Sequence, residues 1–389
     1  MRPSSILHNP SFGKNYETVI FYTFATLIFQ QILSSLNIIK FELVDSTTVL
    51  EILYFGIAIS LISITPRTNL IKAFILIFIF LLIILFSSQI STPLYETIRA
   101  TKWLLFTSCL YLMDTRKLIS VRFLSNLLNL LVISTFIFYT LQKIAFGNHF
   151  RPYLFTENNY EIALLSGILC LRFILDNSRK KGYDKLAIIL FVIIIFLSGS
   201  RSGAICGLIS LYAIYSHTNK NKKTPVTLLF SLPFIYGTSY VFNSRGQNNQ
   251  SIDRIYFFQI FISEMQNKNW FEWIFGSLRI TPISNDGCYA LKFYQTLFAD
   301  PINLSCYSVV FHSILLRILY DFGLIGLLMS FILIFSILRN EIGKKLSITL
   351  LLVSLINGAS VSGINNVYVM FPIFLAMIVK NKNNQNNTF

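Results

Sequence analysis

Residues 312–328 read HSILLRILYDFGLIGLL, and this stretch decides how the chain is interpreted. A histidine and a small polar residue precede a long apolar segment that contains Arg317 and Asp321, and Gly323 follows Ser313 after nine residues. Charged groups inside a membrane helix cost free energy and are uncommon in helices that only anchor a protein. The stretch therefore predicts a membrane helix that belongs to an enzyme or a transporter.

Composition predicts an all-α polytopic membrane protein that forms one integral membrane domain over residues 1–389. The chain is 54% hydrophobic and contains 37 Phe. A bilayer core requires about 20 apolar residues per helix. About twelve segments meet this pattern, namely 18–38, 48–65, 70–87, 97–113, 123–145, 158–175, 184–199, 202–217, 225–243, 309–338, 346–358 and 364–380. The first segment lacks a small-residue cleavage site and is too long for a signal peptide.

The net charge of +15 is distributed as a topology signal. Most of the 32 Lys and Arg residues fall in the tails and short connections on one side of the expected spans, as in 179–181 and 220–223. The positive-inside rule then places both termini in the cytoplasm. Since the basic residues are accounted for in this way, nucleic acid is not an expected partner.

Residues 244–310 form one long connection, which the same rule places outside. The connection is rich in aromatic residues and its basic and acidic residues are equal in number, so we expect it to be ordered. Residues 254–275 predict an amphipathic helix at the membrane interface, with Trp270 and Trp273 at headgroup level. Cys288 and Cys306 lie in this loop and either form a disulfide or remain free.

His312 is the first candidate catalytic residue, because it stands where the outer loop meets the membrane. A neutral imidazole accepts a proton near neutral pH, as a general base must. The alternative is an interfacial histidine bonded to a carbonyl group. Arg317 and Asp321 are four residues apart, and this spacing favours a buried ion pair that joins helices near mid-membrane over a direct catalytic role.

A short hairpin is expected at LSGSRSGAICG, residues 197–207, with Arg201 at its outer tip. Gly199, Gly203 and Gly207 recur every four residues, which favours close helix packing over ligand binding. Arg201 stands at the start of a helix on the outer side, where a guanidinium is suited to a diphosphate. A structural arginine that extends to the interface is the alternative.

Further polar residues supply the remaining candidates. Arg254 precedes the expected interfacial helix and either holds a second phosphate or pairs with Asp253 or Glu264. Glu157, Asn158 and Asn159 open a short span, where they either bind sugar hydroxyls or cap the helix. Arg279, a further basic residue of the outer loop, is included with the substrate-binding candidates. No P-loop, HExxH, GxSxG or acidic metal motif is present, so no cofactor and no metal site are expected.

These residues together resemble the bacterial O-antigen ligase and polymerase superfamily. His312, Ser313 and Gly323 match its His-[Asn/Ser/Gln]-x9-Gly motif, and SGSRSGA resembles its Ser-Arg-Gly/Ala hairpin. Arg254, followed by Trp270 and Gly276, is similar to its outer-loop arginine pattern. The resemblance covers roughly residues 150–340. The chain departs from the family's Arg-x3-Leu pattern, since Ile205 and Phe258 occupy the leucine positions.

The resemblance implies a metal-independent glycosyltransferase on the outer face of the bacterial cytoplasmic membrane. Its donor would be an undecaprenyl-diphosphate-linked oligosaccharide, with Arg201 and Arg254 on the diphosphate and His312 on the acceptor hydroxyl. A polymerase of surface polysaccharide repeats is favoured over a ligase to lipid A core. The resemblance also implies a chain-length regulator in the membrane as a partner. The alternatives from other classes are a lipid-linked oligosaccharide flippase and a purely structural membrane protein; the long ordered loop and the lack of two-fold hydropathy symmetry weigh against the flippase.

Overall fold

The computed structural model describes residues 10–35, 45–62, 67–89, 92–113, 118–147, 150–175, 182–218, 253–291 and 305–379. Over these ranges the fold is all-helical, as expected, and contains two isolated β-bridges but no strand. The helices are α1 (Pro10–Ser35), α2 (Ser46–Ser60), α3 (Arg67–Ser88), α4 (Leu94–Leu112), α5 (Val121–Phe146), α6 (Asn158–Leu175), α7 (Gly182–Ser198), α8 (Arg201–Thr218), α10 (Asp253–Gln266), α11 (Trp270–Phe275), α12 (Asn285–Ala290), η3 (Ser308–Phe311), α14 (Ile314–Ile342), α15 (Lys344–Ser360), η4 (Gly363–Asn365) and α16 (Val367–Ile378).

Within the described residues, five helices are long and apolar enough to cross a membrane. They cover Gly13–Ser35, Leu70–Ser88, Val121–Phe146, Asn158–Leu175 and Ile314–Ile342, and Ser46–Ser60, Lys185–Ser198 and Val367–Ile378 are shorter apolar helices. Each expected span coincides with a helix except 225–243, which lies outside the described residues. The chain therefore has the helices of a membrane protein, while the count of about twelve spans remains a prediction.

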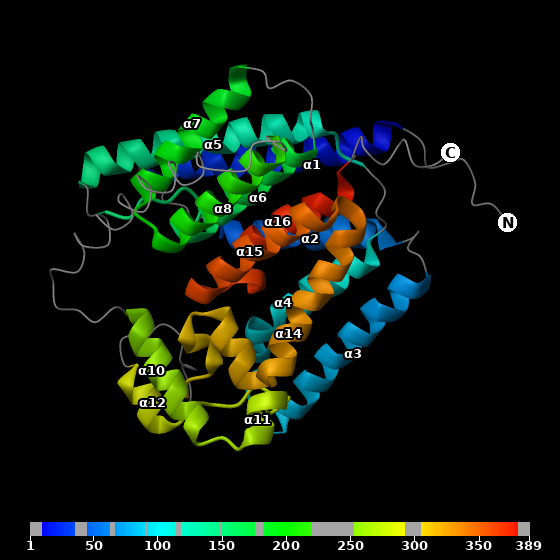
Figure 1. Ribbon diagram of the computed structural model, residues 1–389, viewed down its shortest axis with the longest axis vertical. Coiled ribbons are helices and arrows are strands. Elements are labelled where there is room, and N and C mark those ends of the chain that lie inside the picture. Colours follow the sequence, from blue (N-terminus) through cyan, green and yellow to red (C-terminus); the bar gives the residue numbers. More distant parts are fainter. Residues whose placement is uncertain are drawn as a thin grey trace.

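The apolar side chains divide into a buried centre and an exposed rim. Every residue of α6 and α16 is buried, as expected for helices that are apolar on all sides. On α3, by contrast, Phe74, Phe78 and Leu81 are more than half exposed. An exposed apolar face of this kind suits contact with lipid and not with water. Figure 1 accordingly shows α6 and α16 in the middle and α3 at the edge of the molecule.

Helix α14 is interrupted at Gly323, where the backbone has φ 65° and ψ −171°. A Cβ atom at this position would overlap the backbone of Ile274 and Gly276, and one at Gly276 would overlap Phe322. The two glycines thus allow α11 to lie directly against the backbone of α14. The break also frees the carbonyl of Asp321, which accepts hydrogen bonds from the backbone N–H of Leu278 at 3.1 Å and from Ser277.

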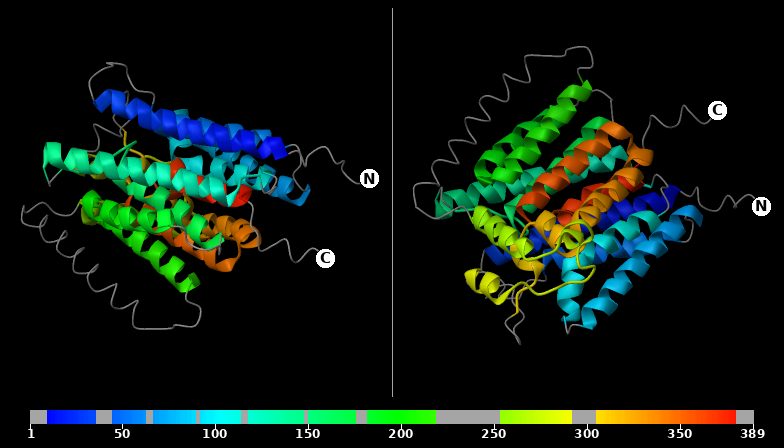
Figure 2. Two further views of the ribbon diagram at one scale, coloured as in Figure 1. Left: turned by 90° about the horizontal axis from the view of Figure 1, so that it is seen from above. Right: turned by 60° about the horizontal axis from the view of Figure 1, so that its bottom comes forward.

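The outer segment forms a small subdomain that comprises α10, α11, α12 and η3, at one end of the molecule (Figures 1 and 2). It has its own apolar core, which includes Phe257, Phe261, Met265, Ile283 and Phe311. The described parts of the loop, 253–291 and 305–310, are therefore ordered, as the sequence predicts. Residues 244–252 and 292–304 lie outside the described residues.

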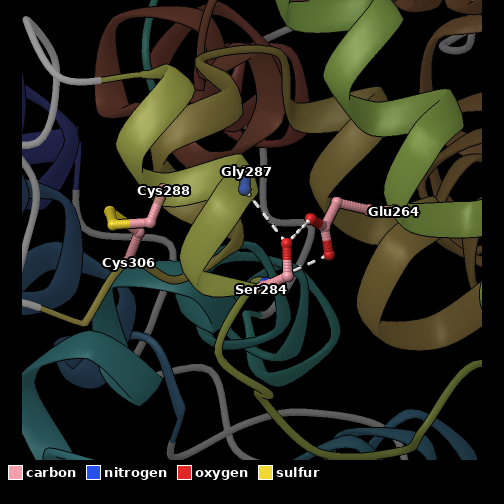
Figure 3. The surroundings of a disulfide bond; sticks show 5 residues. All are labelled: Glu264, Ser284, Gly287, Cys288 and Cys306. Atoms are coloured by element: carbon pink, nitrogen blue, oxygen red, sulfur yellow. Dashed lines mark hydrogen bonds between the residues drawn. A yellow bond between two sulfur atoms is a disulfide. The ribbon is translucent and has the colours of Figure 1, made fainter.

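Of the two alternatives left open for Cys288 and Cys306, the structure shows the disulfide, with 5.5 Å between the two Cα atoms (Figure 3). It connects α12 to the segment that precedes η3. Next to it, the Glu264 carboxylate of α10 accepts hydrogen bonds from the N–H and the hydroxyl of Ser284. A covalent bond and a buried carboxylate thus hold the subdomain together.

The predicted single helix over 254–275 is wrong. Asn269 begins α11 with a capping box, in which its side chain accepts from the N–H of Glu272 at 2.9 Å and the Glu272 carboxylate accepts from the N–H of Asn269. The chain therefore turns between α10 and α11. Trp273 donates its indole N–H to the carbonyl of Met265, whereas Trp270 is 71% exposed. Trp270 remains available for a membrane interface, and Trp273 belongs to the subdomain core.

The contact between α11 and α14 predicts a difference between two glycine substitutions. Gly276 and Gly343 both end helices with positive φ, 70° and 82°, but a Cβ at Gly343 meets open space. Gly343→Ala should lower stability by about 1–3 kcal/mol through backbone strain alone. Gly276→Ala should cost roughly 1–3 kcal/mol more, because the methyl group overlaps backbone atoms. Melting temperatures of the two purified variants in detergent test this; equal shifts would contradict the backbone contact.

Candidate functional site

His312 lies at the centre of a tight turn between η3 and α14. Its backbone has φ 58° and ψ −41°, and the N–H of Ser313 donates to the carbonyl of Phe311 across it. This is a γ-turn with positive φ, the rarer and more strained of the two γ-turn forms. Such conformations cost on the order of 1–3 kcal/mol and persist only where the surroundings enforce them. The half-buried His312 is therefore held, by its neighbours, in a conformation that a histidine seldom adopts.

Several elements enforce this turn. Ser313 begins α14 and donates its hydroxyl to the carbonyl of Gly358 at 2.9 Å. Arg317 donates from Nη2 to the carbonyl of His312 at 3.2 Å. On the other side, the ring of Phe257 on α10 lies 5.4 Å from the imidazole, centroid to centroid. Helix α10 also carries Arg254, one helical turn before Phe257. The outer subdomain thus brings the helix of the predicted loop arginine next to His312.

The hairpin between α7 and α8 has the predicted form. Gly199 occupies the turn with φ 58°, and Ser200 accepts from the N–H of Gly203 at the start of α8. A Cβ at Gly203 would overlap Ile162 of α6, and one at Gly207 would overlap Ile195 of α7. The prediction that these glycines serve close helix packing is confirmed.

Asn158 and Asn159 are buried and bind this hairpin. Asn158 donates from Nδ2 to the carbonyl of Ser198 at 2.9 Å, and the Oδ1 atom of Asn159 accepts from the hydroxyl of Ser200. Both amides are therefore engaged in fixing the turn that carries Arg201. Glu157 is exposed beside them, and its carbonyl accepts from the N–H of Tyr160 at the start of α6.

A second carboxylate, Glu161, fixes the loop that precedes α6. It accepts hydrogen bonds from the N–H groups of Leu154, Phe155 and Thr156 and from the hydroxyl of Tyr139, at 2.6–3.0 Å. A buried carboxylate that receives this many donors is fully satisfied. Sequence reasoning missed Glu161, because nothing in the local sequence shows that the preceding loop folds back over it.

Arg201 is the first residue of α8 and is partly exposed at the hairpin. Partial burial lowers its pKa, and the positive charge of Arg151 on the neighbouring loop lowers that pKa further. The outer end of α6 therefore presents two guanidinium groups close enough to repel each other. Two such groups favour a polyanionic ligand such as a diphosphate, which each of them is able to bind in a bidentate manner.

Residues 357–366, NGASVSGINN, connect these features, and sequence reasoning missed them as well. Asn357 donates to the carbonyl of Asn159 at 2.9 Å, and the N–H of Ser362 donates to the hydroxyl of Tyr160 at 3.0 Å. Asn365 accepts from the N–H of Trp103 and donates to the carbonyl of Arg99, both on α4. We call this segment the polar connector. Its run of small and polar residues between two apolar segments was the signal available in the sequence.

The polar connector joins the two main candidate residues. Ser313, next to His312, binds Gly358, while the adjacent Asn357 binds Asn159, which in turn binds the hairpin of Arg201. Three hydrogen bonds, linked through the covalent neighbours Asn357 and Gly358 and through Asn159, thus connect the His312 turn to the Arg201 turn. Both lie on one network, although no single contact joins their side chains in the described part of the chain.

The two remaining arginine candidates, Arg254 and Arg279, have no described contact with this network. Arg254 has its backbone in the first turn of α10, and its side chain lies outside what the structure describes. Arg279 is exposed, on a segment that is bound to the α3–α4 connection. There the N–H of Ile280 donates to Ser87 and the carbonyl of Ile280 accepts from Thr92, both at 3.0 Å. None of the contacts among the described residues joins Arg279 to His312 or Arg201.

The predicted ion pair between Arg317 and Asp321 is wrong. Over the described ranges the ion pairs are Arg99–Glu96 and Lys102–Glu51. Side chains on a helix lean toward its N-terminus, so Arg317 extends toward His312 and away from Asp321. Asp321 instead accepts a hydrogen bond from the hydroxyl of Ser308 in the outer subdomain.

Asp321 also contacts the subdomain through two different groups. Its carbonyl and carboxylate both bind residues of the outer subdomain, because α14 is broken at Gly323 and α11 lies at that level. Close by, Lys268 donates to the carbonyl of Tyr320 at 2.6 Å. Burial lowers the pKa of Lys268, although the carboxylate of Asp321 acts in the opposite direction.

The arrangement combines an imidazole, guanidinium groups and hydroxyls. In the described ranges no cluster of His, Cys, Asp and Glu side chains is suited to a metal ion. Comparison with protein-family models and with curated proteins gives no match for this chain. The chemistry of the site therefore has to be inferred from its own residues.

The strained turn predicts an unusual order of stability at position 312. Glycine adopts positive φ without a steric penalty, so His312→Gly should be more stable than His312→Ala by about 1 kcal/mol. At Ile144, an exposed position on the regular helix α5, the alanine variant should be the more stable one by a similar amount. Melting temperatures of the four variants in detergent measure both differences. An alanine variant as stable as the glycine variant at position 312 would argue against strain there.

Proposed function

We propose that this chain is a membrane glycosyltransferase that polymerises lipid-linked oligosaccharide repeats, an O-antigen polymerase. The observation that carries the proposal is the hydrogen-bonded network that holds a strained His312 and the hairpin of Arg201 around the polar connector. A base and a phosphate-binding group are the two functions that transfer from a sugar diphosphate requires. The apolar helices are consistent with a substrate that remains in the membrane.

In the proposed reaction, a hydroxyl group of the acceptor sugar attacks the anomeric carbon of the donor. His312 accepts the hydroxyl proton as the new carbon–oxygen bond forms. The bond between the anomeric carbon and the diphosphate oxygen breaks, and its electron pair leaves with the lipid diphosphate. Arg201, with Arg254 from α10, stabilises the charge that develops on this leaving group. Asn158 and Asn159 position the Arg201 hairpin, while Glu157 and Arg279 are proposed to contact the saccharide.

The proposed site is on the outer face of the bacterial cytoplasmic membrane. Support comes from the cysteines: Cys288 and Cys306 in the outer subdomain are bonded, whereas Cys109, Cys170 and Cys206 in the helices are free. Disulfides persist in oxidising compartments such as the periplasm. The proposed topology has about twelve spans with both termini in the cytoplasm. The undecaprenyl-diphosphate donor, the bilayer and a chain-length regulator are the proposed partners.

This topology predicts opposite locations for two reporter fusions. Alkaline phosphatase is active in the periplasm, so a fusion after Ser284 should be active and one after Lys382 should be inactive. Fluorescent-protein fusions at the same positions should show the reverse pattern and control for expression. Activity of the same reporter at both positions would contradict the topology.

The catalytic roles predict selective loss of chain extension. His312→Ala should reduce extension by roughly 10²–10⁴-fold, because general-base assistance is lost. Arg201→Lys should also lose most activity, since an ammonium group does not reproduce the bidentate guanidinium. His217→Ala and Arg339→Lys, at the opposite ends of α8 and α14 from these residues, serve as matched controls. Polysaccharide ladders and protein levels are measured in a strain that lacks the chromosomal copy.

Ladders of the deletion strain discriminate between the candidate functions. A single-repeat band supports the polymerase. Bare core with accumulated lipid-linked polymer indicates a ligase, and complete absence of surface repeats indicates a flippase. A normal ladder, or wild-type extension by His312→Ala protein, would remove the proposal.

A further inference from the structure

Arg317 occupies a position that is unfavourable for a cation. It lies in the first turn of α14, where the helix dipole disfavours positive charge, and it is only 4% exposed. No carboxylate lies within 4.0 Å of its guanidinium among the described residues, and its Nε atom has no hydrogen-bond partner there. A buried charge of this kind is costly unless it is compensated. Joining two helices is therefore a poor explanation for Arg317.

The direct contact of Arg317 is with His312 itself, through the hydrogen bond from Nη2 to the His312 carbonyl. That bond holds the γ-turn from the side of α14, in addition to the bonds that Ser313 makes. The guanidinium also places a positive charge 3.2 Å from the backbone carbonyl oxygen of a residue whose imidazole is half-buried. A nearby cation disfavours protonation of an imidazole.

Other charged groups act on the same region. The elements packed around the turn carry Glu96 and Arg99 on α4, Glu157 and Tyr160 on α6, Arg254 on α10 and Asp321 on α14. The charges of Glu96, Arg99 and Asp321 and the phenol of Tyr160 act on Arg317. Two of the acids are engaged elsewhere, Glu96 with Arg99 and Asp321 with Ser308. Arg317 is within hydrogen-bond distance of the His312 carbonyl, 3.2 Å from Nη2 to the oxygen.

We propose that Arg317 is a positioning residue for His312: its guanidinium fixes the γ-turn and its charge keeps the imidazole neutral. A neutral imidazole is the form that accepts a proton from an acceptor hydroxyl. This inference rests on the proposed role of His312 as a base. It adds a residue that accepts no proton and contacts no substrate, but that sets the pH range over which the base is available.

The proton state of His312 is measurable without any glycosyl transfer. An imidazole reacts with diethyl pyrocarbonate only in its neutral form, so mass spectrometry of the His312 peptide across a pH series gives the midpoint of its titration in the purified full chain. In Arg317→Met the midpoint should move up by about one pH unit, because the adjacent cation is removed. In Arg317→Lys it should remain close to the wild-type value, since the charge is retained. Arg172→Met, which removes a buried arginine of α6, should not move it.

An unchanged midpoint in folded Arg317→Met protein would overturn the proposal. A second measurement needs no variant: His312 of the wild-type chain should titrate at lower pH when folded than when unfolded in denaturant, and the reverse order would equally overturn the proposal.

Extension activity then tests whether this coupling affects catalysis. Arg317→Met should lose roughly 10–100-fold, with the acid limb of its pH profile shifted upward. If His312→Ala proves active while the titration behaves as expected, the proposed function fails and the electrostatic coupling stands.

Discussion

The backbone contact between Gly276 and Gly323 is the constraint on which the outer end of the molecule depends. It breaks α14 and leaves Leu324–Ile342 as a continuous helix of roughly 28 Å, about the thickness of a bilayer core. The break supplies a free carbonyl at Asp321, and the outer subdomain satisfies it. Because α10 belongs to the same subdomain, this attachment also sets the position of Phe257 against His312. The nine residues between Ser313 and Gly323 are therefore the length of helix between the candidate base and the attachment point.

The polar connector links the remaining helices in the same way that the glycine contact links the subdomain to α14. Irregular backbone at membrane depth is tolerated only where protein groups satisfy its hydrogen bonds. In the connector, the N–H of Ser362 donates to Tyr160 and the carbonyl of Gly358 receives the hydroxyl of Ser313, while the side chains of Asn357 and Asn365 bind backbone groups of α6 and α4. A single segment thus stabilises the turn of His312, the start of α6 and the middle of α4. Changes in any of these three elements are expected to affect the other two.

The sequence predicted features that depend on local pattern and composition, including the helices and the glycine packing at Gly203, and it left the disulfide open. It did not predict Glu161, Asn357 or Asn365, because the partners of these side chains are distant in the chain or lie on an irregular loop. The pairing of Arg317 with Asp321 failed for another reason. Spacing of four residues gives proximity on an uninterrupted helix but not the direction of each side chain. The turn before α11 could have been predicted from the sequence, because Asn269 and Glu272 have the spacing of a capping box.

The site is built from features that oppose folding. His312 is held at positive φ, Arg201 lies near a second guanidinium, and Arg317 is buried at the positive end of a helix. Each would be lost from a protein selected for stability alone, since single substitutions would relieve it. They persist beside unusually well-satisfied anchors, such as the four donors on Glu161 and the disulfide of the outer subdomain. A functional site typically combines strained backbone and unfavourable charge with strong supporting bonds around them. This pattern, independent of any resemblance, supports placing the proposed chemistry at the N-terminal ends of α6, α8 and α14.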